Sequence, residues 1–395
     1  MRPLTCPGRL LGLAAVVLAL LGSATRCSMA TDPGVTATAI KIGAYNAITG
    51  PIPLTGKQMQ VGWQTAVNSI NDAGGINGRK LELLVEDDQY EPSRALAAAR
   101  KLVERDQVFV VTGTGTPTSV VVARHLDRAK VPLLFPMGAS STQLNQAGLH
   151  YLFMIHPAYI TQAEVINAWM IANAGVKRPC IIYQLDPAGE DHLAGFKKAL
   201  ERTQVALTAA EPVERGASEF SAPVLKAKNA ACDMLYTATP LEAAARIVTA
   251  ADRLGWRPKF AGFTTQADAT LIQLLGPLAE GFHAADILLR PTSDAPAMKE
   301  YLARLKRYFP DATPTFFSTY AYTAMHVIGE ALKQAGNPPT RDRLIAAMEA
   351  WKNFSTGLMG PISFDPKNHD GKRSLYMIQV KNGDWQQVSD WIGER

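Results

Sequence analysis

The chain of 395 residues has only four cysteines and seven histidines, and neither residue type is clustered. No two histidines have the i, i+4 spacing of a helical metal site, and the cysteines are too far apart to form one. A phosphate-binding loop is also absent, and Gly113-Thr114-Gly115 lacks the third glycine of a dinucleotide fingerprint. We therefore expect no cofactor, no metal ion and no enzymatic activity.

A block of charge of one sign is missing as well. The formal net charge is +5, acidic and basic residues are interspersed, and basic clusters are as short as Lys197-Lys198. A protein that binds nucleic acid usually concentrates its positive charge on one stripe or face. We expect no nucleic-acid partner.

The one long apolar run lies at the N-terminus. A basic start precedes the run at 10–21, and small residues follow it up to Ala30. The run is shorter than the ~20 residues of a membrane span, and its basic, apolar and small segments have the order of a secretory signal. We predict a signal peptide over residues 1–30, cleaved after Ala24 or Ala30, and a periplasmic mature protein.

Two cysteines, Cys180 and Cys232, lie in the body of the chain, each at the start of an apolar, strand-like run. Export to an oxidising compartment permits a disulfide bond between them. Two separately buried thiols fit the sequence equally well, so both alternatives stay open.

Short apolar runs alternate with helical patterns twice along the chain, first over residues 40–156 and then over 161–288. Such alternation is typical of parallel sheets that are covered by helices on both faces. Three further helical patterns follow, at 297–308, 318–334 and 341–351. The chain ends in β-like runs around an Asn382-Gly383 turn. We predict two doubly wound α/β units with a ligand-binding cleft between them.

Three segments near the start of the mature chain carry a family resemblance. They are Gly43-Ala-Tyr-Asn-Ala-Ile-Thr-Gly-Pro51, Asn71-Asp-Ala-Gly-Gly-Ile-Asn-Gly-Arg79 and Glu86-Asp-Asp88. With them the chain resembles the periplasmic Leu/Ile/Val-binding family, the type I solute-binding proteins of ABC importers. The resemblance covers nearly all of the mature chain. It implies the α/β type I periplasmic-binding-protein fold, in which a three-segment hinge joins two doubly wound parallel-sheet lobes.

The resemblance also implies lobe boundaries and a mechanism. Lobe 1 would comprise residues 38–157 and 286–373, and lobe 2 residues 158–285 and 374–395. The lobes would close about a small-molecule ligand. The expected partner is the membrane permease of an ABC importer, and the receptor is expected to be a monomer. A ligand-sensing protein of the same fold, specific for an amide or an amino-acid-like solute, is the alternative.

By the same resemblance, lobe 1 and the hinge should bind the carboxylate of a ligand. Thr116 would cap a helix that begins at Pro117, leaving the N–H groups of Thr118 and Ser119 free for an anion. Ser140 takes the position of a Thr that holds the carboxylate in the family. The expected ligand-binding residues here are Thr55, Thr116, Pro117, Thr118, Gly138, Ala139, Ser140, Tyr159 and Tyr320. Tyr159 also fits hinge packing, and Tyr320 also fits a core position.

Lobe 2 departs from the amino-acid binders of the family. Thr264 stands where they place an acid that meets the ligand's ammonium, and Ala188 stands where they place an aromatic residue. A buried ammonium without a carboxylate partner is costly. Asp186 is a candidate substitute, or else only a turn residue before the next helix. The ligand is therefore expected to be either a non-zwitterionic aromatic or keto acid, or a branched-chain or other hydrophobic amino acid.

Overall fold

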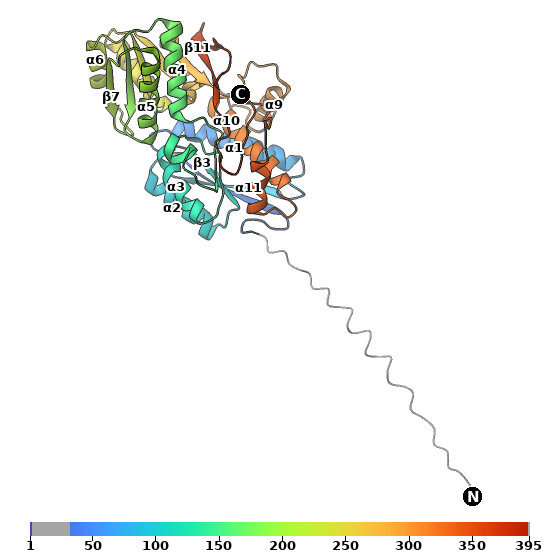
Figure 1. The fold of residues 1–395 in the computed structure, drawn as a ribbon. Helices are drawn as coiled ribbons and strands as arrows, with labels where there is room; N and C mark the ends of the chain where they lie inside the picture. The colour runs from blue at the N-terminus through green and yellow to red at the C-terminus, as the bar shows by residue number, and fades with distance from the viewer. Residues whose placement is uncertain (2–31, 394–395) are drawn as a thin grey trace. The chain divides into compact units, whose positions relative to one another are not determined.

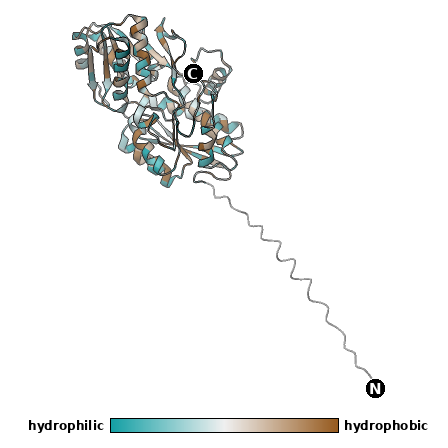
Figure 2. Ribbon diagram, in the orientation of Figure 1, coloured by the Kyte–Doolittle hydropathy of each residue, from teal (hydrophilic) through white to brown (hydrophobic). Residues whose placement is uncertain are grey.

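Residues 32–393, which a computed structural model describes together with Met1, build two mainly parallel β-sheets covered by helices (Figure 1). Apart from Met1, the expected signal peptide over residues 1–30 lies outside the described residues. Figure 2 shows hydrophobic colour along strands of both sheets, whereas the helices carry both hydrophilic and hydrophobic stretches. This is the arrangement expected when each strand is buried and each helix keeps one face in solvent.

The first sheet has the strand order β2-β1-β3-β4-β5, with every neighbouring pair parallel. Its strands are β1 (Ala39–Asn46), β2 (Lys80–Asp87), β3 (Val110–Gly113), β4 (Leu133–Leu134) and β5 (Leu152–Phe153). Helices α1 (Pro53–Asp72), α2 (Pro92–Arg100) and α3 (Thr116–Arg128) connect them. Ile40 and Ile42 are fully buried because β1 is an inner strand with partners on both sides.

The second sheet has the order β12-β11-β10-β9-β8-β6-β7, and β13 pairs with β11. Its strands are β6 (Pro179–Gln184), β7 (Ala209–Val213), β8 (Met234–Ala238), β9 (Lys259–Gly262), β10 (His283–Asp286), β11 (Ser374–Lys381), β12 (Asp384–Gln387) and β13 (Ile392–Gly393). The parallel strands β7-β6-β8-β9-β10 repeat the 2-1-3-4-5 order of the first sheet. The predicted repeat of architecture is confirmed. Ligands of such sheets bind where the strand order reverses, at the carboxyl ends of the strands.

The helices after β10 return to the first sheet. Those of the second series are α4 (Tyr159–Ala174), α5 (Pro187–Thr203), α6 (Ser221–Asn229), α7 (Leu241–Arg253) and α8 (Ala269–Leu275), and the last three are α9 (Pro296–Tyr308), α10 (Phe316–Gln334) and α11 (Arg341–Glu349). Helix α10 lies beside α1 (Figure 1). A Cβ added to Gly62 of α1 would be 2.2 Å from the carbonyl oxygen of Ser318 of α10, so these helices touch backbone to backbone.

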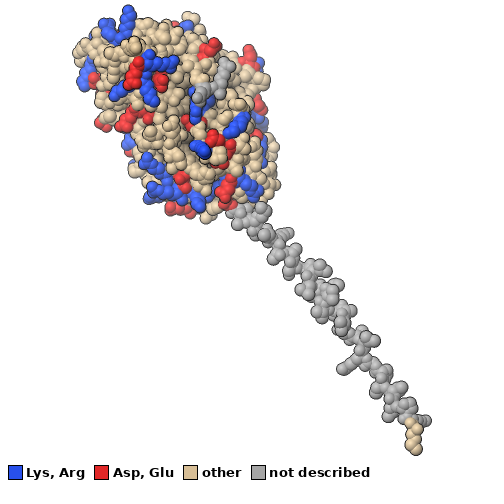
Figure 3. All heavy atoms as spheres, in the orientation of Figure 1, with Lys and Arg blue, Asp and Glu red and all other residues tan. Residues whose placement is uncertain are grey.

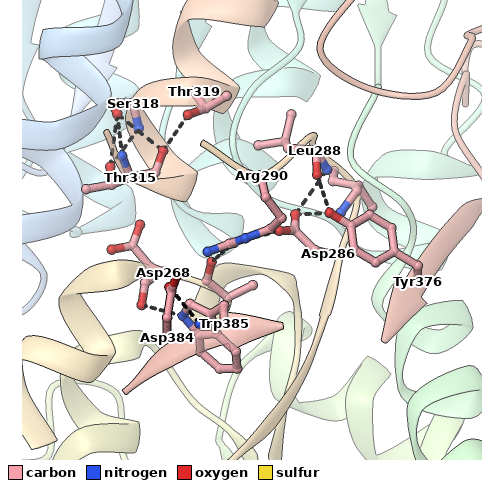
Figure 4. Close-up of polar contacts among 12 residues, drawn as sticks. Asp268, Asp286, Leu288, Arg290, Thr315, Ser318, Thr319, Tyr376, Asp384 and Trp385 are labelled. Carbon is pink, nitrogen blue, oxygen red and sulfur yellow. Dashed lines mark hydrogen bonds and ion pairs between the residues drawn. The ribbon is translucent and has the colours of Figure 1, made fainter. Parts of the chain in front are cut away.

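The segment that leaves β10 is held by a buried ion pair (Figure 4). Arg290 Nη1 lies 2.9 Å from Asp286 Oδ2, and Asp286 Oδ1 accepts the N–H groups of Ile287 and Leu288. Tyr376 of β11 donates its hydroxyl to the carbonyl oxygen of Leu288. Burial raises the pKa of Asp286, and the positive charge of Arg290 opposes that rise. These contacts fix the chain where it crosses from the second sheet towards the first.

Two local predictions concern the second sheet. Asn382 and Gly383 both have positive φ, 56° and 76°, and Lys381 lies opposite Asp384, so the predicted two-residue hairpin turn is confirmed. Cys180 and Cys232 are joined by a disulfide bond with their Cα atoms 6.0 Å apart. Of the two alternatives that the sequence left open, the structure contains the bond.

Surface charge is mixed on the face drawn in Figure 3, where lysines and arginines lie among acidic residues. Within residues 32–393, no helix combines the length and the apolar character needed to cross a bilayer.

Candidate ligand-binding site

A cavity lies where segments that follow the carboxyl ends of strands from both sheets come together. The cavity is open to solvent, and its empty space measures about 520 Å³ when the solvent at its mouth is counted. Its walls are Ile52, Thr55, Tyr90, Thr114, Gly115, Thr116, Met137, Tyr159, Gln184, Ala188, His192, Ala238, Thr239, Pro240, Leu241, Phe263, Thr265 and Phe317. The position at the strand ends of two doubly wound sheets is that of a small-molecule site.

The structure brings only some of the predicted site residues to this cavity. Thr55, Thr116, Tyr159 and Ala188 line it. The predicted residues that do not line it are Pro117, Thr118, Gly138, Ala139, Ser140, Asp186, Thr264 and Tyr320.

Helix α3 begins one residue earlier than predicted. Gly115 is its N-cap and Thr116 its first residue, so the prediction that Thr116 caps the helix is wrong. Thr116 Oγ1 instead accepts the N–H of Ala139 at 3.3 Å and donates to the hydroxyl of Tyr159 at 3.5 Å. The N–H of Ser119 is not free, because it donates to the carbonyl oxygen of Gly115 at 3.0 Å.

Hydroxyl groups therefore dominate the wall around the start of α3. Thr114 Oγ1 is buried and has no partner among the described residues. The hydroxyl of Tyr90 accepts a hydrogen bond from Gln184 Nε2 at 3.2 Å, which leaves its proton available. Together with Thr116 and Tyr159, these groups can donate to an anion, and the N-terminus of α3 adds its partial positive charge.

Tyr90 lies on the cavity wall at the end of a short segment with left-handed backbone conformation. Gln89 and Tyr90 have positive φ values of 55° and 62°, and buried Asp88 Oδ1 accepts the N–H of Tyr90 at 2.8 Å. Burial raises the pKa of Asp88 to about 7. The ring of Tyr90 packs so close to Gly115 that a Cβ there would lie 2.8 Å from its Cε2 atom.

Replacing Gly115 by alanine should lower the free energy of unfolding by about 2–3 kcal/mol, because φ 97° is nearly exclusive to glycine and the new methyl meets Tyr90. Gly148→Ala is the matched control, since φ is 68° there but nothing lies within 4 Å of the added atom. It should cost about 1 kcal/mol. Urea unfolding of both variants measures the difference. The added atom would also lie 2.7 Å from Thr118 Oγ1, so equal losses would show that its contacts with Tyr90 and Thr118 are unimportant.

The segment after β4 contributes Met137 to the cavity, and not the predicted residues 138–140. Ser140 uses its N–H to bond Asn145 Oδ1 at 3.1 Å, behind the wall. Tyr320 is fully buried, and its hydroxyl donates to the two main-chain carbonyls that precede Met137. From the same helix, Phe317 lines the cavity instead.

Neither position considered for an ammonium partner lies on the wall. Asp186 is the N-cap of α5, where its Oδ1 accepts the N–H of Gly189 at 2.9 Å. Thr264 Oγ1 is bonded to His156 Nε2 at 2.8 Å and to Gln162 Oε1 at 3.0 Å. Both side chains are thus occupied within the protein.

None of the described residues that line the cavity carries a charged side chain at neutral pH. His192 is fully buried, and burial lowers its pKa well below the ordinary value, so its ring is neutral. Charged side chains appear in an adjoining hollow of about 1120 Å³, to which Glu242 and Arg246 belong. The two spaces share Ile52, Gln184, Thr239 and Pro240 as walls.

Sequence reasoning missed several wall residues, among them Tyr90, Gln184, His192 and Thr265. Two of them follow from simple rules. His192 is four residues after Ala188 on α5, hence on the same helix face. Thr265 is three residues after the last residue of β9, at the carboxyl end of a strand, where ligands of such sheets bind. Tyr90 gave no such signal, because its place depends on two residues with positive φ.

Comparison with known proteins agrees with this architecture. The sequence model of the periplasmic binding protein family matches residues 39–384. Leu/Ile/Val-binding protein homolog 1 of Brucella suis biovar 1 is 26% identical over 350 residues, which cover 87% of this chain and 91% of that protein. A possible leucine/isoleucine/valine-binding protein from Rhodopirellula baltica has a TM-score of 0.83 at 22% identity, covering 91% of this chain and 98% of that one.

A second solved structure carries a ligand. The solute-binding protein of an ABC transporter from Rhodopseudomonas palustris BisB5, in complex with 3,4-dihydroxybenzoic acid, has a TM-score of 0.80 at 24% identity. The alignment covers 90% of this chain and 97% of that one. With the family match over most of its length and a two-lobed type I fold, this chain belongs to the Leu/Ile/Val-binding family of periplasmic binding proteins.

Proposed function

We propose that the protein is the exported receptor of an ABC importer and that it closes two lobes on a non-zwitterionic organic carboxylate, an aromatic or keto acid. One observation carries the proposal: the cavity offers several hydroxyl donors at one end and no charged side chain on its wall. A ligand with one negative charge and no positive charge matches that distribution.

The carboxylate would bind beside the start of α3. Thr114 Oγ1 is buried without a partner, and Thr116 Oγ1 makes only long contacts of 3.3 and 3.5 Å. A hydrogen bond from a hydroxyl to a carboxylate is stronger than one between neutral groups. Both threonines therefore gain more from an anionic ligand than from the contacts they have now.

An ammonium group would be poorly served in the same cavity. Asp186 already caps α5, and Thr264 already bonds His156 and Gln162. Burying an unpaired ammonium costs several kcal/mol in free energy, or else shifts its pKa until it loses its proton. A branched-chain or other hydrophobic amino acid would fit the apolar walls, but its charge would be unmatched.

Aromatic side chains favour a flat ligand. Tyr90, Tyr159, His192, Phe263 and Phe317 all line the cavity. Offset stacking and edge-to-face contacts between rings contribute about 0.5–1.5 kcal/mol each beyond the burial of apolar area. The small side chain of Ala188 leaves room for a ring on the side of α5.

The proposed lobes are residues 38–157 with 286–373, and residues 158–285 with 374–395. Contacts between them support a closed form. Gln184 Nε2 donates to the hydroxyl of Tyr90 at 3.2 Å, and Arg215 Nη2 lies 2.8 Å from Glu91 Oε2. A receptor that opened would break these bonds, and a ligand that touches both lobes would restore them.

A thermal-shift screen tests the proposed ligand class. Aromatic and keto acids should raise the melting temperature, because a ligand that binds only the folded state stabilises it. Leucine, isoleucine, valine and phenylalanine should leave it unchanged at the same concentration. A shift with the amino acids alone would overturn the proposal.

A further inference from the structure

The wall formed by α5 and the segment after β9 contains two neutral polar atoms that have no partner among the described residues. They are Nε2 of His192 on α5 and Oγ1 of Thr265, which follows β9, and both atoms are buried. His192 is fully buried and Thr265 is 8% exposed. An unpaired buried polar group costs about 1–3 kcal/mol of stability, so a ligand that pairs with it recovers that free energy.

The ring of His192 is held firmly in one orientation. Its Nδ1 lies 2.9 Å from the hydroxyl of Tyr236, behind the wall of the cavity. Its face stacks on Tyr159 with the ring centres 4.4 Å apart, and Phe263 lies at 4.3 Å. Since Nδ1 is engaged by Tyr236, Nε2 is the nitrogen left for a ligand.

The hydroxyl of Tyr236 also selects the tautomer. Tyr236 is fully buried, and among the described residues the hydrogen-bond partner of its hydroxyl is His192 Nδ1, so the phenol proton is paired when it is donated to that nitrogen. A phenol that donates to Nδ1 leaves the single N–H proton of the neutral imidazole on Nε2. His192 then presents an N–H donor, while Thr265 can both donate and accept.

We propose that His192 Nε2 and Thr265 Oγ1 form a second polar subsite, which takes an uncharged oxygen substituent on the ligand, remote from its carboxylate. The N–H of His192 would donate to that oxygen, and a ligand hydroxyl would in turn donate to Thr265. This inference rests on the proposed function. It narrows the proposed ligand class to carboxylic acids that carry a hydroxyl or carbonyl group at the end remote from the carboxylate.

The architecture of the site supports that placement. Thr114 and Thr116 follow β3 of the first sheet, whereas His192 and Thr265 belong to segments of the second. A ligand with oxygen at both ends would therefore bond to both sheets. Its two ends would hold the closed form together, whereas a ligand with an apolar far end would leave His192 and Thr265 unpaired.

Calorimetry on the mature protein tests the subsite with 3-phenylpropanoate and its three ring-monohydroxylated isomers. These four ligands share one carboxylate and one ring, and they differ only in the oxygen. We expect at least one isomer to bind the wild type 10-fold or more tightly than the parent. In His192→Phe, which keeps an aromatic ring beside Tyr159, that preference should fall below threefold.

Thr265→Val is the second variant, because it is nearly isosteric and leaves the bond between His192 and Tyr236 intact. It should reduce the preference for the hydroxylated isomer at least threefold and leave the melting temperature of the free protein unchanged or higher. Equal binding of all four ligands, or a preference that survives in both variants, would overturn the subsite alone. Failure of the wild type to bind any of the four would overturn the proposed ligand class together with the subsite.

Discussion

Replacing Thr114 and Thr116 by valine is expected to weaken carboxylate binding by roughly 1000-fold. A hydrogen bond to a charged group contributes about 1.5–3 kcal/mol, or about 10- to 150-fold in affinity, for each hydroxyl removed. Thr114 Oγ1 has no partner within the part of the chain that the structure describes, so Thr114→Val should not lower the stability of the free protein. The measurement is titration calorimetry of both single variants and the double variant with one carboxylate.

Thr112→Val is the matched control for this experiment. Thr112 lies on β3 two residues before Thr114, its hydroxyl is also buried and has no partner among the described residues, and it does not line the cavity. The variant should bind the ligand as the wild type does. If Thr112→Val weakened binding as much as Thr114→Val, the effect would come from the packing of β3 and not from contact with the ligand.

Removal of the bond between Cys180 and Cys232 is expected to lower the free energy of unfolding by about 4 kcal/mol. The cysteines are 52 residues apart, and a cross-link over a loop of that length restricts the unfolded chain strongly. The bond also ties β6 to the segment just before β8, its neighbour in the sheet. Guanidinium unfolding of Cys180→Ala/Cys232→Ala beside the oxidised wild type measures the loss.

The wild type with its disulfide reduced distinguishes the effect of losing the bond from the effect of replacing the two cysteine side chains. Unfolded in the presence of dithiothreitol, it should lose nearly as much stability as the double variant, because it keeps both sulfur atoms and lacks only the bond. If oxidised and reduced wild type unfold at the same denaturant concentration, the disulfide does not stabilise this protein.

The sequence was sufficient for the fold because the signals of the fold are local and repeated. Buried runs such as 40–47 and helical patterns such as 297–308 each follow from a short window, and the Asn382-Gly383 turn follows from two residues. Two sheets of the same strand order are the consequence of two such series. Element boundaries were predicted less exactly: α10 begins at Phe316, two residues before the helical pattern predicted at 318–334.

The site was predicted only in part because its walls depend on contacts between distant segments. Thr55, Thr116, Tyr159 and Ala188 were found by resemblance. Residues 138–140 were expected on the wall by the same route, yet they lie behind it. A difference of one position along the chain decides whether a side chain lies on the wall. Thr264 is bonded within the protein, whereas its neighbour Thr265 lines the cavity.

The lack of an acid at the position of Thr264 was the most informative departure from the amino-acid binders of the family. The structure supports the conclusion that an ammonium group has no partner here, because the candidate substitute Asp186 caps the start of α5. Glu242 of the adjoining hollow is a further acid near the cavity, and its Oε1 accepts the N–H of Thr55 at 3.4 Å. Burial raises the pKa of Glu242, which makes it a weaker partner for a cation.

The most direct test of the proposed ligand class compares 3-phenylpropanoate with L-phenylalanine by calorimetry on the mature protein. The two molecules differ only in the α-ammonium group. The account predicts that 3-phenylpropanoate binds at least 100-fold more tightly, because the cavity has donors for its carboxylate and no partner for an ammonium. Tighter binding of L-phenylalanine would contradict the account, because the ammonium group would then have a partner that the cavity wall does not offer.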